Sequence, residues 1–233
     1  MNLTGAKALI TGGSEGIGYA IAAALIAKGA QVAITGRDQQ KLDIAAEKLG
    51  IKGIQGDVSV EADAEATVSQ FVAEFGGIDI LVNNAGFGYF AQLVDLDLEK
   101  FTAVFATNVT GAMLMGRAAA RHFVKQESGA LINISSTSGL SGGKSSSAYS
   151  GSKFALRGMT ECWRAELRPH NVRVMLVNPS EVQTNFSAKL GRQQELSARK
   201  LRSEEIATAI VGALEIDDRG FIPEFSVFAT NPF

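Results

Sequence analysis

A tyrosine and a lysine lie four positions apart in the stretch SSSAYSGSKFAL, residues 145–156. If this stretch begins a helix, Tyr149 and Lys153 share one face, one turn apart, and the ammonium lies near the phenol. A phenol titrates near pH 10, but an ammonium about 4 Å away favours the phenolate by roughly 4 kcal/mol at an effective dielectric of 20. The spacing predicts that Tyr149 is an acid and base with a lowered pKa. A core tyrosine covered by the stem of a lysine would show the same spacing.

A second candidate site is the glycine-rich stretch TGGSEGIGYA, which follows the apolar run KALIT at 7–11. Thr11, Gly12, Gly16 and Gly18 form the pattern T-G-x-x-x-G-x-G, in which a strand passes through a tight turn into a helix. The free N–H groups and the positive end of such a helix suit a pyrophosphate. The alternative is a turn whose glycines only let a strand and a helix pack closely.

Polar and small residues also follow later apolar runs. Asp57, after the third predicted strand, could accept a hydrogen bond from an adenine amino group. The tetrapeptide NNAG at 83–86 follows the fourth strand, and its alanine and glycine are small enough for the backbone to touch a cofactor. Asn108 follows the amphipathic run LEKFTAVFAT. Each residue also suits a turn or a helix cap, so only their combination with Tyr149 and Lys153 indicates a dinucleotide site.

A repeated strand–helix pattern must position these residues. Apolar runs typical of buried parallel strands lie at 7–11, 31–35, 78–83, 129–135 and 172–178, and shorter strands are predicted near 52–56 and 220–225. The segments between them have apolar residues at helical spacing, and several end in glycine. We expect one α/β domain over residues 1–233, a Rossmann-type doubly wound parallel sheet of about seven strands with helices on both faces.

Composition argues against several classes of protein. A net charge of −2 over 233 residues offers no basic field for a nucleic-acid partner. The first residues lack the features of a secretory signal, and no segment approaches 18 uninterrupted apolar residues, so we expect a cytoplasmic protein with no membrane partner. Cys162 is the only cysteine and His122 and His170 are the only histidines, so we expect neither a disulfide nor a metal site.

The motifs TGGSEGIG, NNAG, Asn108, INISS with Ser136, YSGSK and NPSEVQT resemble, in order and spacing, the short-chain dehydrogenase/reductase family over roughly residues 4–184. The resemblance implies a nicotinamide-binding Rossmann domain with Asn108, Ser136, Tyr149 and Lys153 as catalytic residues. It also implies that Lys153 binds the nicotinamide ribose and that Asn108 holds a water linking Lys153 to solvent. Ser136 would donate a hydrogen bond to the substrate oxygen as its charge develops.

The predicted cofactor contacts combine these motifs with their neighbours: Thr11, Gly12, Ser14, Gly16, Ile17, Gly18, Arg37, Asp57, Val58, Asn84, Ala85, Gly86, Tyr149, Lys153, Pro179, Val182 and Thr184. The resemblance is incomplete at Ser180, which stands where glycine is usual after Pro179, and at Glu15, where many NADP-dependent members have a basic residue.

Arg37 indicates which nicotinamide cofactor is used. It follows the second predicted strand, where an NAD-preferring site would show a carboxylate on the ribose 2′-hydroxyl. An arginine instead suits the 2′-phosphate, so NADP is the expected cofactor. NAD stays open as the alternative because Glu15 and Asp38 add negative charge, although Asp38 could be only the N-cap of the next helix.

We therefore expect an oxidoreductase in which Tyr149 gives a proton to the carbonyl oxygen of a ketone, aldehyde or 3-oxoacyl substrate while NADPH delivers hydride, or takes the proton back in alcohol oxidation. A non-catalytic NAD(P)-binding regulatory protein would have a broken Ser, Tyr, Lys set, and here the set is intact. A sugar-nucleotide epimerase or dehydratase would need a larger carboxyl-terminal domain than the 49 residues that follow Thr184.

The substrate is predicted only as a small molecule. The loop FGYFAQLVDL carries Phe87, Tyr89, Phe90 and Leu93, which could wall an apolar pocket or pack against the neighbouring helices. Two polar segments, 138–147 and a substrate loop at 185–202, are predicted to be mobile and to flank the site. Their basic residues could meet an anionic or carrier-bound substrate or could simply be solvated: Lys144, Lys189 and Arg192.

The helices predicted at about 109–125 and 150–168 carry more apolar surface than one contact with the sheet needs. The residues concerned are Met113, Met115, Phe154, Met159 and Trp163. We expect a homo-oligomer, a tetramer or a dimer, formed through these helices, as the family resemblance also implies. Burial of the same residues within the monomer is the alternative.

Overall fold

The computed structural model describes residues 1–184, 186 and 197–232. Within these residues seven parallel strands form one sheet in the order β3-β2-β1-β4-β5-β6-β7. The strands are β1 (Lys7–Thr11), β2 (Gln31–Gly36), β3 (Lys52–Gln55), β4 (Ile80–Asn83), β5 (Gly129–Ile134), β6 (Val172–Pro179) and β7 (Glu224–Val227). The predicted doubly wound parallel sheet is confirmed.

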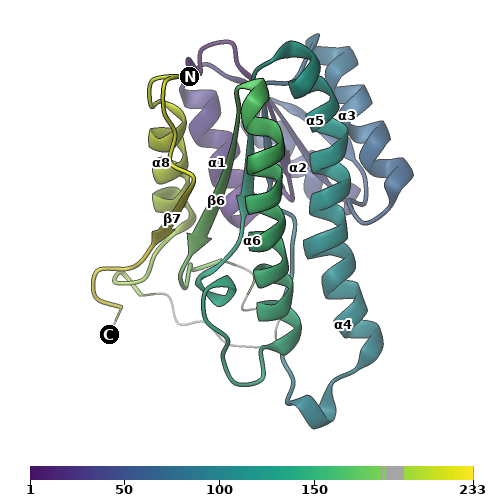
Figure 1. Cartoon of the computed structure of the whole chain (residues 1–233), viewed down its shortest axis with the longest axis vertical. Helices are drawn as coiled ribbons and strands as arrows, with labels where there is room; N and C mark the ends of the chain where they lie inside the picture. Colours follow the sequence, from purple (N-terminus) through teal and green to yellow (C-terminus); the bar gives the residue numbers. More distant parts are fainter. Residues whose placement is uncertain (185, 187–196, 233) are drawn as a thin grey trace.

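Helices cover both faces of the sheet (Figure 1). Those of the described residues are α1 (Gly16–Ala27), α2 (Gln39–Leu49), α3 (Glu61–Phe75), α4 (Leu98–Phe105), α5 (Ala112–Gln126), α6 (Ser147–Leu167) and α8 (Ser203–Leu214). The helices α1, α2 and α8 share one hydrophobic core with one face of the sheet, and α3 and α5 share a second core with the opposite face. In Figure 1, α6 lies in front of β6, whereas α1 lies behind the sheet.

The strands are apolar along their whole length because both of their faces are buried. In β4, Ile80 and Val82 belong to the core under α1 and α8, while Leu81 between them belongs to the core under α3 and α5. Successive side chains of a strand point to opposite faces, so a sheet covered on both sides needs an apolar residue at every position.

The strand order places a ligand site between β1 and β4. The chain builds outward from β1 to β3 and then crosses back to place β4 on the other side of β1. At such a switch point the connections leave the two neighbouring strands in opposite directions, which opens a crevice at their carboxyl ends. The candidate residues after Thr11 and after Asn83 follow these two strands.

A chain of buried amides fastens the sheet to two helices. The Nδ2 group of Asn83 on β4 donates to Ala112 O and to Asn133 Oδ1, at 3.0 and 2.9 Å. Asn133 Nδ2 donates to Thr160 Oγ1 at 2.8 Å, and Thr160 donates to Leu156 O within α6. Asn83 is therefore occupied with holding β4, β5, α5 and α6 together.

The last strand differs from the prediction. It spans 224–227 instead of the expected 220–225, because Pro223 lacks the N–H that a strand ladder needs. Phe221 and Ile222 instead pack against the core formed with α1 and α8.

No helix among residues 1–184, 186 and 197–232 is long and apolar enough to cross a membrane.

Candidate functional site

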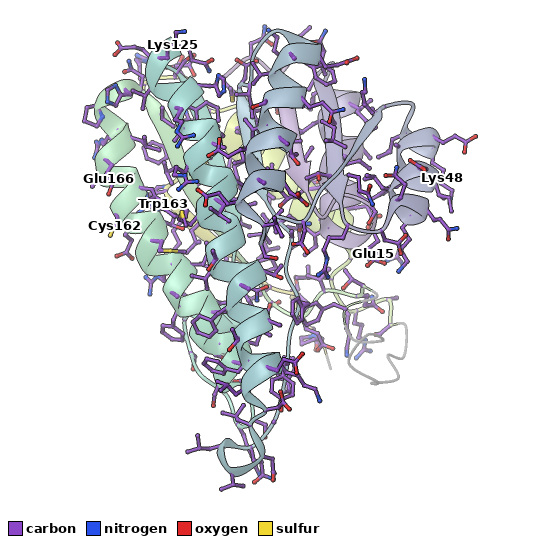
Figure 2. The ribbon with its side chains drawn as sticks, turned by 90° about the vertical axis from the view of Figure 1, so that its right-hand side faces the viewer. Glu15, Lys48, Lys125, Cys162, Trp163 and Glu166 are labelled. Atoms are coloured by element: carbon purple, nitrogen blue, oxygen red, sulfur yellow. The ribbon has the colours of Figure 1, made fainter. Side chains whose placement is uncertain are left out.

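A cavity of about 580 Å³ opens beyond the carboxyl ends of β1, β2 and β4. Its described lining includes the glycine turn after β1, the segment after β2, the NNAG segment after β4, and Tyr149 and Lys153 of α6. Glu15 also belongs to this lining. In Figure 2 it lies below α2, the helix that carries the labelled Lys48.

Two polar side chains join the glycine turn to the NNAG segment. Thr11 Oγ1 accepts hydrogen bonds from the backbone N–H groups of Asn84 and Ala85, at 3.0 and 2.9 Å. Asn84 Nδ2 donates in return to the carbonyls of Thr11 and Gly12, both at 3.0 Å. Gly12 has a φ of +63°, and a Cβ there would lie 2.9 Å from Ala85 Cα, so only glycine fits. We call the two bonds accepted by Thr11 Oγ1 and the two donated by Asn84 Nδ2 the Thr11–Asn84 clasp.

The first turn of α1 is available to a ligand. Its N-cap residue, Glu15, makes no capping bond with its side chain, and Gly16 and Ile17 line the cavity. The Oγ1 of Thr35, also in the lining, is buried without a hydrogen-bond partner. A helix N-terminus favours phosphate groups, and an orphaned hydroxyl at another part of the lining, near Gly56, suits a polar ligand. These residues fit a dinucleotide.

Charged residues gather after β2 and β3. Arg37 Nη1 lies 3.5 Å from Asp57 Oδ2, and both the N–H and the hydroxyl of Ser59 donate to Asp57 Oδ1. Burial raises the pKa of the Asp57 carboxyl, but the bonds from Ser59 and the charge of Arg37 outweigh it and leave the pKa below its usual value. The predicted contact of Asp57 with adenine would therefore compete with these partners.

Lys41 joins this charged group, and the sequence reading did not single it out. It lines the cavity together with Arg37 and Asp38, and its Nζ lies 3.9 Å from Asp38 Oδ2. Asp38 is the N-cap of α2 and accepts from the N–H of Lys41, as one of the two readings of Asp38 expected. The available signal was Asp38 as the N-cap, because it places Lys41 in the first turn of α2, close to the end of β2.

Tyr149 and Lys153 lie on the first turns of α6, as predicted. Lys153 Nζ is 5.8 Å from the centre of the Tyr149 ring and donates to Ile134 O at 2.8 Å. Burial lowers the pKa of the Lys153 ammonium to about 8. The lysine therefore carries its charge at neutral pH, close to the point where it loses the proton.

The pKa of Tyr149 moves in the direction opposite to the prediction. Burial raises the pKa of the phenol, and a hydrogen bond with the Ser136 hydroxyl opposes that rise. The expected lowering by Lys153 is wrong for this geometry, because the ammonium is bonded to a β5 carbonyl and the cost of desolvating a phenolate dominates. Ser136 Oγ also accepts from Ser138 N at 3.1 Å, which fixes the serine at the start of a short 3-10 turn, η3 (Thr137–Gly139).

Asn108 lies in a π-helical turn, η2 (Ala106–Gly111), between α4 and α5. Its Oδ1 accepts from the N–H of Phe87 at 3.0 Å, and its Nδ2 donates to Phe87 O at 2.9 Å and to Ser152 Oγ at 3.0 Å. Ser152 donates to the carbonyl of Tyr149 at 2.7 Å. In this geometry Asn108 ties the loop after β4 to the helix that carries Tyr149.

The described lining contains most of the predicted cofactor residues: Gly12, Ser14, Gly16, Ile17, Arg37, Val58, Asn84, Ala85, Gly86, Tyr149, Lys153 and Thr184. Five others lie outside that lining: Thr11, Gly18, Asp57, Pro179 and Val182. Thr11 acts through the clasp, and a Cβ on Gly18 would lie 2.5 Å from both Asn84 Nδ2 and Gly12 O. Val182 forms an isolated bridge with Leu201.

Most of the predicted loop at 185–202, with Lys189 and Arg192, lies outside the described residues. The described end of this loop is held by Gln183, which precedes the loop. Gln183 Nε2 donates to the carbonyls of Ser197 and Lys200. Phe186, which the sequence analysis did not single out, lines the cavity beside Tyr149.

Comparison with known proteins gives one consistent result. The sequence matches the family described as short chain dehydrogenase over residues 6–195. The oxidoreductase asL5 of Sarocladium schorii is 33% identical over 229 residues, which cover 94% of this chain and 92% of that protein. An uncharacterized oxidoreductase of Staphylococcus epidermidis is 32% identical over 209 residues, or 89% of this chain and 90% of the relative.

Solved structures of similar proteins share the whole fold. A short-chain type dehydrogenase/reductase from Mycobacterium marinum superposes with a TM-score of 0.85 at 31% identity, over 98% of this chain and 96% of the other. An alcohol dehydrogenase of Thermococcus sibiricus complexed with 5-hydroxy-NADP gives 0.88 at 26% identity, over 96% of both chains. A 3-ketoacyl-(acyl-carrier-protein) reductase of Brucella melitensis complexed with NADH gives 0.88 at 26% identity, over 99% of this chain and 100% of the other.

Proposed function

Because the chain belongs to the short-chain dehydrogenase family, we propose that it is an oxidoreductase that reduces a ketone or aldehyde, or oxidises the corresponding alcohol, with a nicotinamide dinucleotide. The observation that carries this proposal is that Tyr149 and Lys153 line the same cavity as a glycine turn before a helix, with the Ser136 side chain next to the Tyr149 phenol. The first group can move a proton, and the second suits a pyrophosphate.

Tyr149 is the proposed proton donor in reduction. Its raised pKa keeps the phenol protonated at neutral pH, so a proton is available for the carbonyl oxygen. Lys153 is charged at the same pH and would favour the phenolate that remains after the transfer. Ser136, whose side chain lies next to the phenol, would donate to the substrate oxygen and stabilise its developing charge.

The cofactor end of the site would be formed by the glycine turn, the first turn of α1 and the clasped NNAG segment. Hydride transfer is the chemistry that a nicotinamide supplies when bound. We propose NADP as the preferred form, supported by the guanidinium of Arg37 and the ammonium of Lys41 at the end of β2. The relatives leave this choice open, since one is complexed with 5-hydroxy-NADP and another with NADH.

The test is the consumption of NADPH and of NADH with a panel of ketones, aldehydes, diketones and 3-oxoacyl thioesters. We expect turnover with at least one class and a higher kcat/KM with NADPH. The variant Tyr149→Phe should lower kcat by about 10²- to 10⁴-fold, because it loses only the transferable proton. Its affinity for the cofactor, measured by fluorescence titration, should stay within about threefold of the wild type.

Two outcomes would overturn the proposal. If the protein binds NADPH but turns over none of these substrates, the regulatory alternative is favoured. If Tyr149→Phe keeps wild-type turnover, Tyr149 is not the proton donor.

A further inference from the structure

Resting on the proposed function, we propose that the rings of Phe90 and Phe186 form an aromatic wall beside Tyr149 that selects carbonyl compounds bearing an aryl group. The wall consists of these two residues and the backbone of Gly88 between them.

The wall is defined by ring contacts. The centre of the Phe90 ring lies 5.6 Å from that of Tyr149 at an interplanar angle of 42°, and the Phe186 ring lies 5.5 Å away at 54°. Aromatic rings attract one another in tilted or offset arrangements at centroid distances of about 4.5–7 Å. The proposed proton donor is therefore flanked by two further rings.

Gly88 brings the two rings together. A Cβ at this glycine would lie 2.6 Å from Phe90 Cε2 and 2.9 Å from Phe186 Cζ, so both ring edges approach the same backbone position. Gly88, Phe186 and Tyr149 all line the cavity, as does Phe87. An aryl group next to a carbonyl that reaches Tyr149 would meet the Phe186 ring, while Phe90 lies outside the described lining and supports the wall through its contacts with Tyr149 and Gly88.

The structure also decides which residues of the loop after β4 take part. The hydroxyl of Tyr89 accepts from Asp97 N at 3.0 Å and donates to Asp95 O at 3.3 Å, and Lys100 Nζ lies 5.7 Å from its ring. Leu93 is 80% exposed. Of the four apolar residues that the sequence offered, Phe87 and Phe90 lie beside the site, while Tyr89 and Leu93 contribute to the outer surface.

Charge supports the same substrate class. The described charged residues of the lining, apart from Lys153, belong to the segments after β1 and β2: Glu15, Arg37, Asp38 and Lys41. Lys153 is already bonded to Ile134 O. Gly88 and Phe186 belong to the uncharged part of the described lining, and Phe186 packs on the Tyr149 ring, so this part of the site suits an aryl group.

The test uses two unreactive amides of similar size, benzamide and cyclohexanecarboxamide, titrated by calorimetry into the protein with NADP⁺. We expect benzamide to bind about two- to tenfold more tightly, which is the gain of an aromatic pair beyond apolar contact. The double variant Phe90→Leu/Phe186→Leu should abolish this preference. Phe186→Tyr should keep it, and Phe228→Leu, at an exposed phenylalanine outside the cavity lining, should leave it unchanged.

Equal or tighter binding of cyclohexanecarboxamide, or no binding of benzamide, would overturn the proposal that the wall selects an aryl group. Kinetics separate this result from the fate of the proposed function. If no carbonyl compound is reduced but benzamide is preferred, the oxidoreductase proposal fails and the wall stands. If both acetophenone and cyclohexyl methyl ketone are reduced and the double variant Phe90→Leu/Phe186→Leu leaves the ratio of their kcat/KM values unchanged, the oxidoreductase stands and the wall fails.

Discussion

Arg37 is the residue at which we expect cofactor choice to be decided. Its guanidinium is 64% exposed and paired with Asp57, so a ligand phosphate has to replace that pairing. A bidentate bond to a phosphate at such a site is worth about 1.5–3 kcal/mol. Arg37→Asp should therefore lower kcat/KM for NADPH by roughly ten- to a hundredfold relative to NADH. The two values are to be measured at one stated ionic strength, because salt screens the contact.

The matched control for this prediction is Lys48→Asp, the same change of charge at an exposed position on the far part of α2 (Figure 2). A wild-type enzyme that prefers NADH, or a cofactor ratio that Arg37→Asp leaves unchanged, would remove Arg37 from cofactor recognition.

Lys153 gives a prediction about pH. Its ammonium has a pKa of about 8, so the charge is present below pH 8 and is lost as the pH rises through that value. If the charge is needed, kcat/KM for NADPH should be level from pH 6 to 7.5 and fall above about pH 8, because this constant reports the ionisation of the free enzyme. The variant Lys153→Arg should not show the fall of kcat/KM above about pH 8, since a guanidinium stays charged. A fall that persists in Lys153→Arg would belong to another group.

At the residue scale, the sequence predicted which residues belong to the site better than it predicted their hydrogen-bond and charge partners. Tyr149 and Lys153 were placed correctly because four residues make one helical turn. Their pKa values were not predictable from spacing, since burial and the bond from Lys153 to Ile134 O depend on β5, which is distant in the sequence. The pairing of Arg37 with Asp57 likewise depends on the neighbouring positions of β2 and β3 in the sheet.

At the scale of elements, the π-helical turn η2 has no sequence signal. The residues from Leu98 to Gln126 have helical spacing throughout, and the structure shows α4, η2 and α5 as one continuous helical rod (Figure 1). The strands were predictable because both faces of the sheet are covered, which makes each strand an uninterrupted apolar run. The extra residue of a π-turn leaves no such pattern, yet it often marks a functional site.

Asn108 is the residue that this turn positions. Asn108→Ala removes three buried or partly buried hydrogen bonds and leaves the carbonyl and N–H of Phe87 without their side-chain partner. We expect the free energy of unfolding to fall by about 1–3 kcal/mol. We also expect kcat to fall, because the Phe87 loop and Ser152 lose a common support. Urea denaturation and steady-state kinetics measure the two effects.

Thr110→Ala is the control, since Thr110 is an exposed residue of the same π-turn. If Asn108→Ala were no less stable and no slower than Thr110→Ala, the hydrogen bonds of Asn108 would carry no weight in the site.

At the scale of the whole molecule, we expect subunits to join through α5 and α6, as predicted from the sequence, and exposed apolar residues extend this expectation to the region at the start of α4. Leu93, Val94 and Leu98 are 79–87% exposed at the start of α4 and in the short turn before it, and Phe154 on α6 is 44% exposed. Exposed large apolar side chains of this kind are typical of interaction surfaces. Light scattering at micromolar concentration should give a multiple of the monomer mass of 24.5 kDa.

Phe154→Glu combined with Leu98→Glu should lower the measured mass, and Phe228→Glu, at another exposed phenylalanine, should not. A wild-type mass of one subunit would contradict the prediction. Of the residues that the sequence offered on α5 and α6, Met115 is withdrawn because it is buried in the core with α3. The sequence could not show which of Met113 and Met115 is buried, because the apolar pattern of α5 does not reveal which side of the helix faces the sheet.

The Thr11–Asn84 clasp has a consequence for the motions of the free protein. The amide hydrogens of Asn84 and Ala85 lie in a loop, where exchange with deuterium is ordinarily fast. Both are held by the hydroxyl of a buried threonine on β1, so opening them requires separating the ends of two neighbouring strands. These two amides should therefore exchange at rates typical of the central strands, and Thr11→Val, which keeps the shape of the side chain without its oxygen, should speed their exchange.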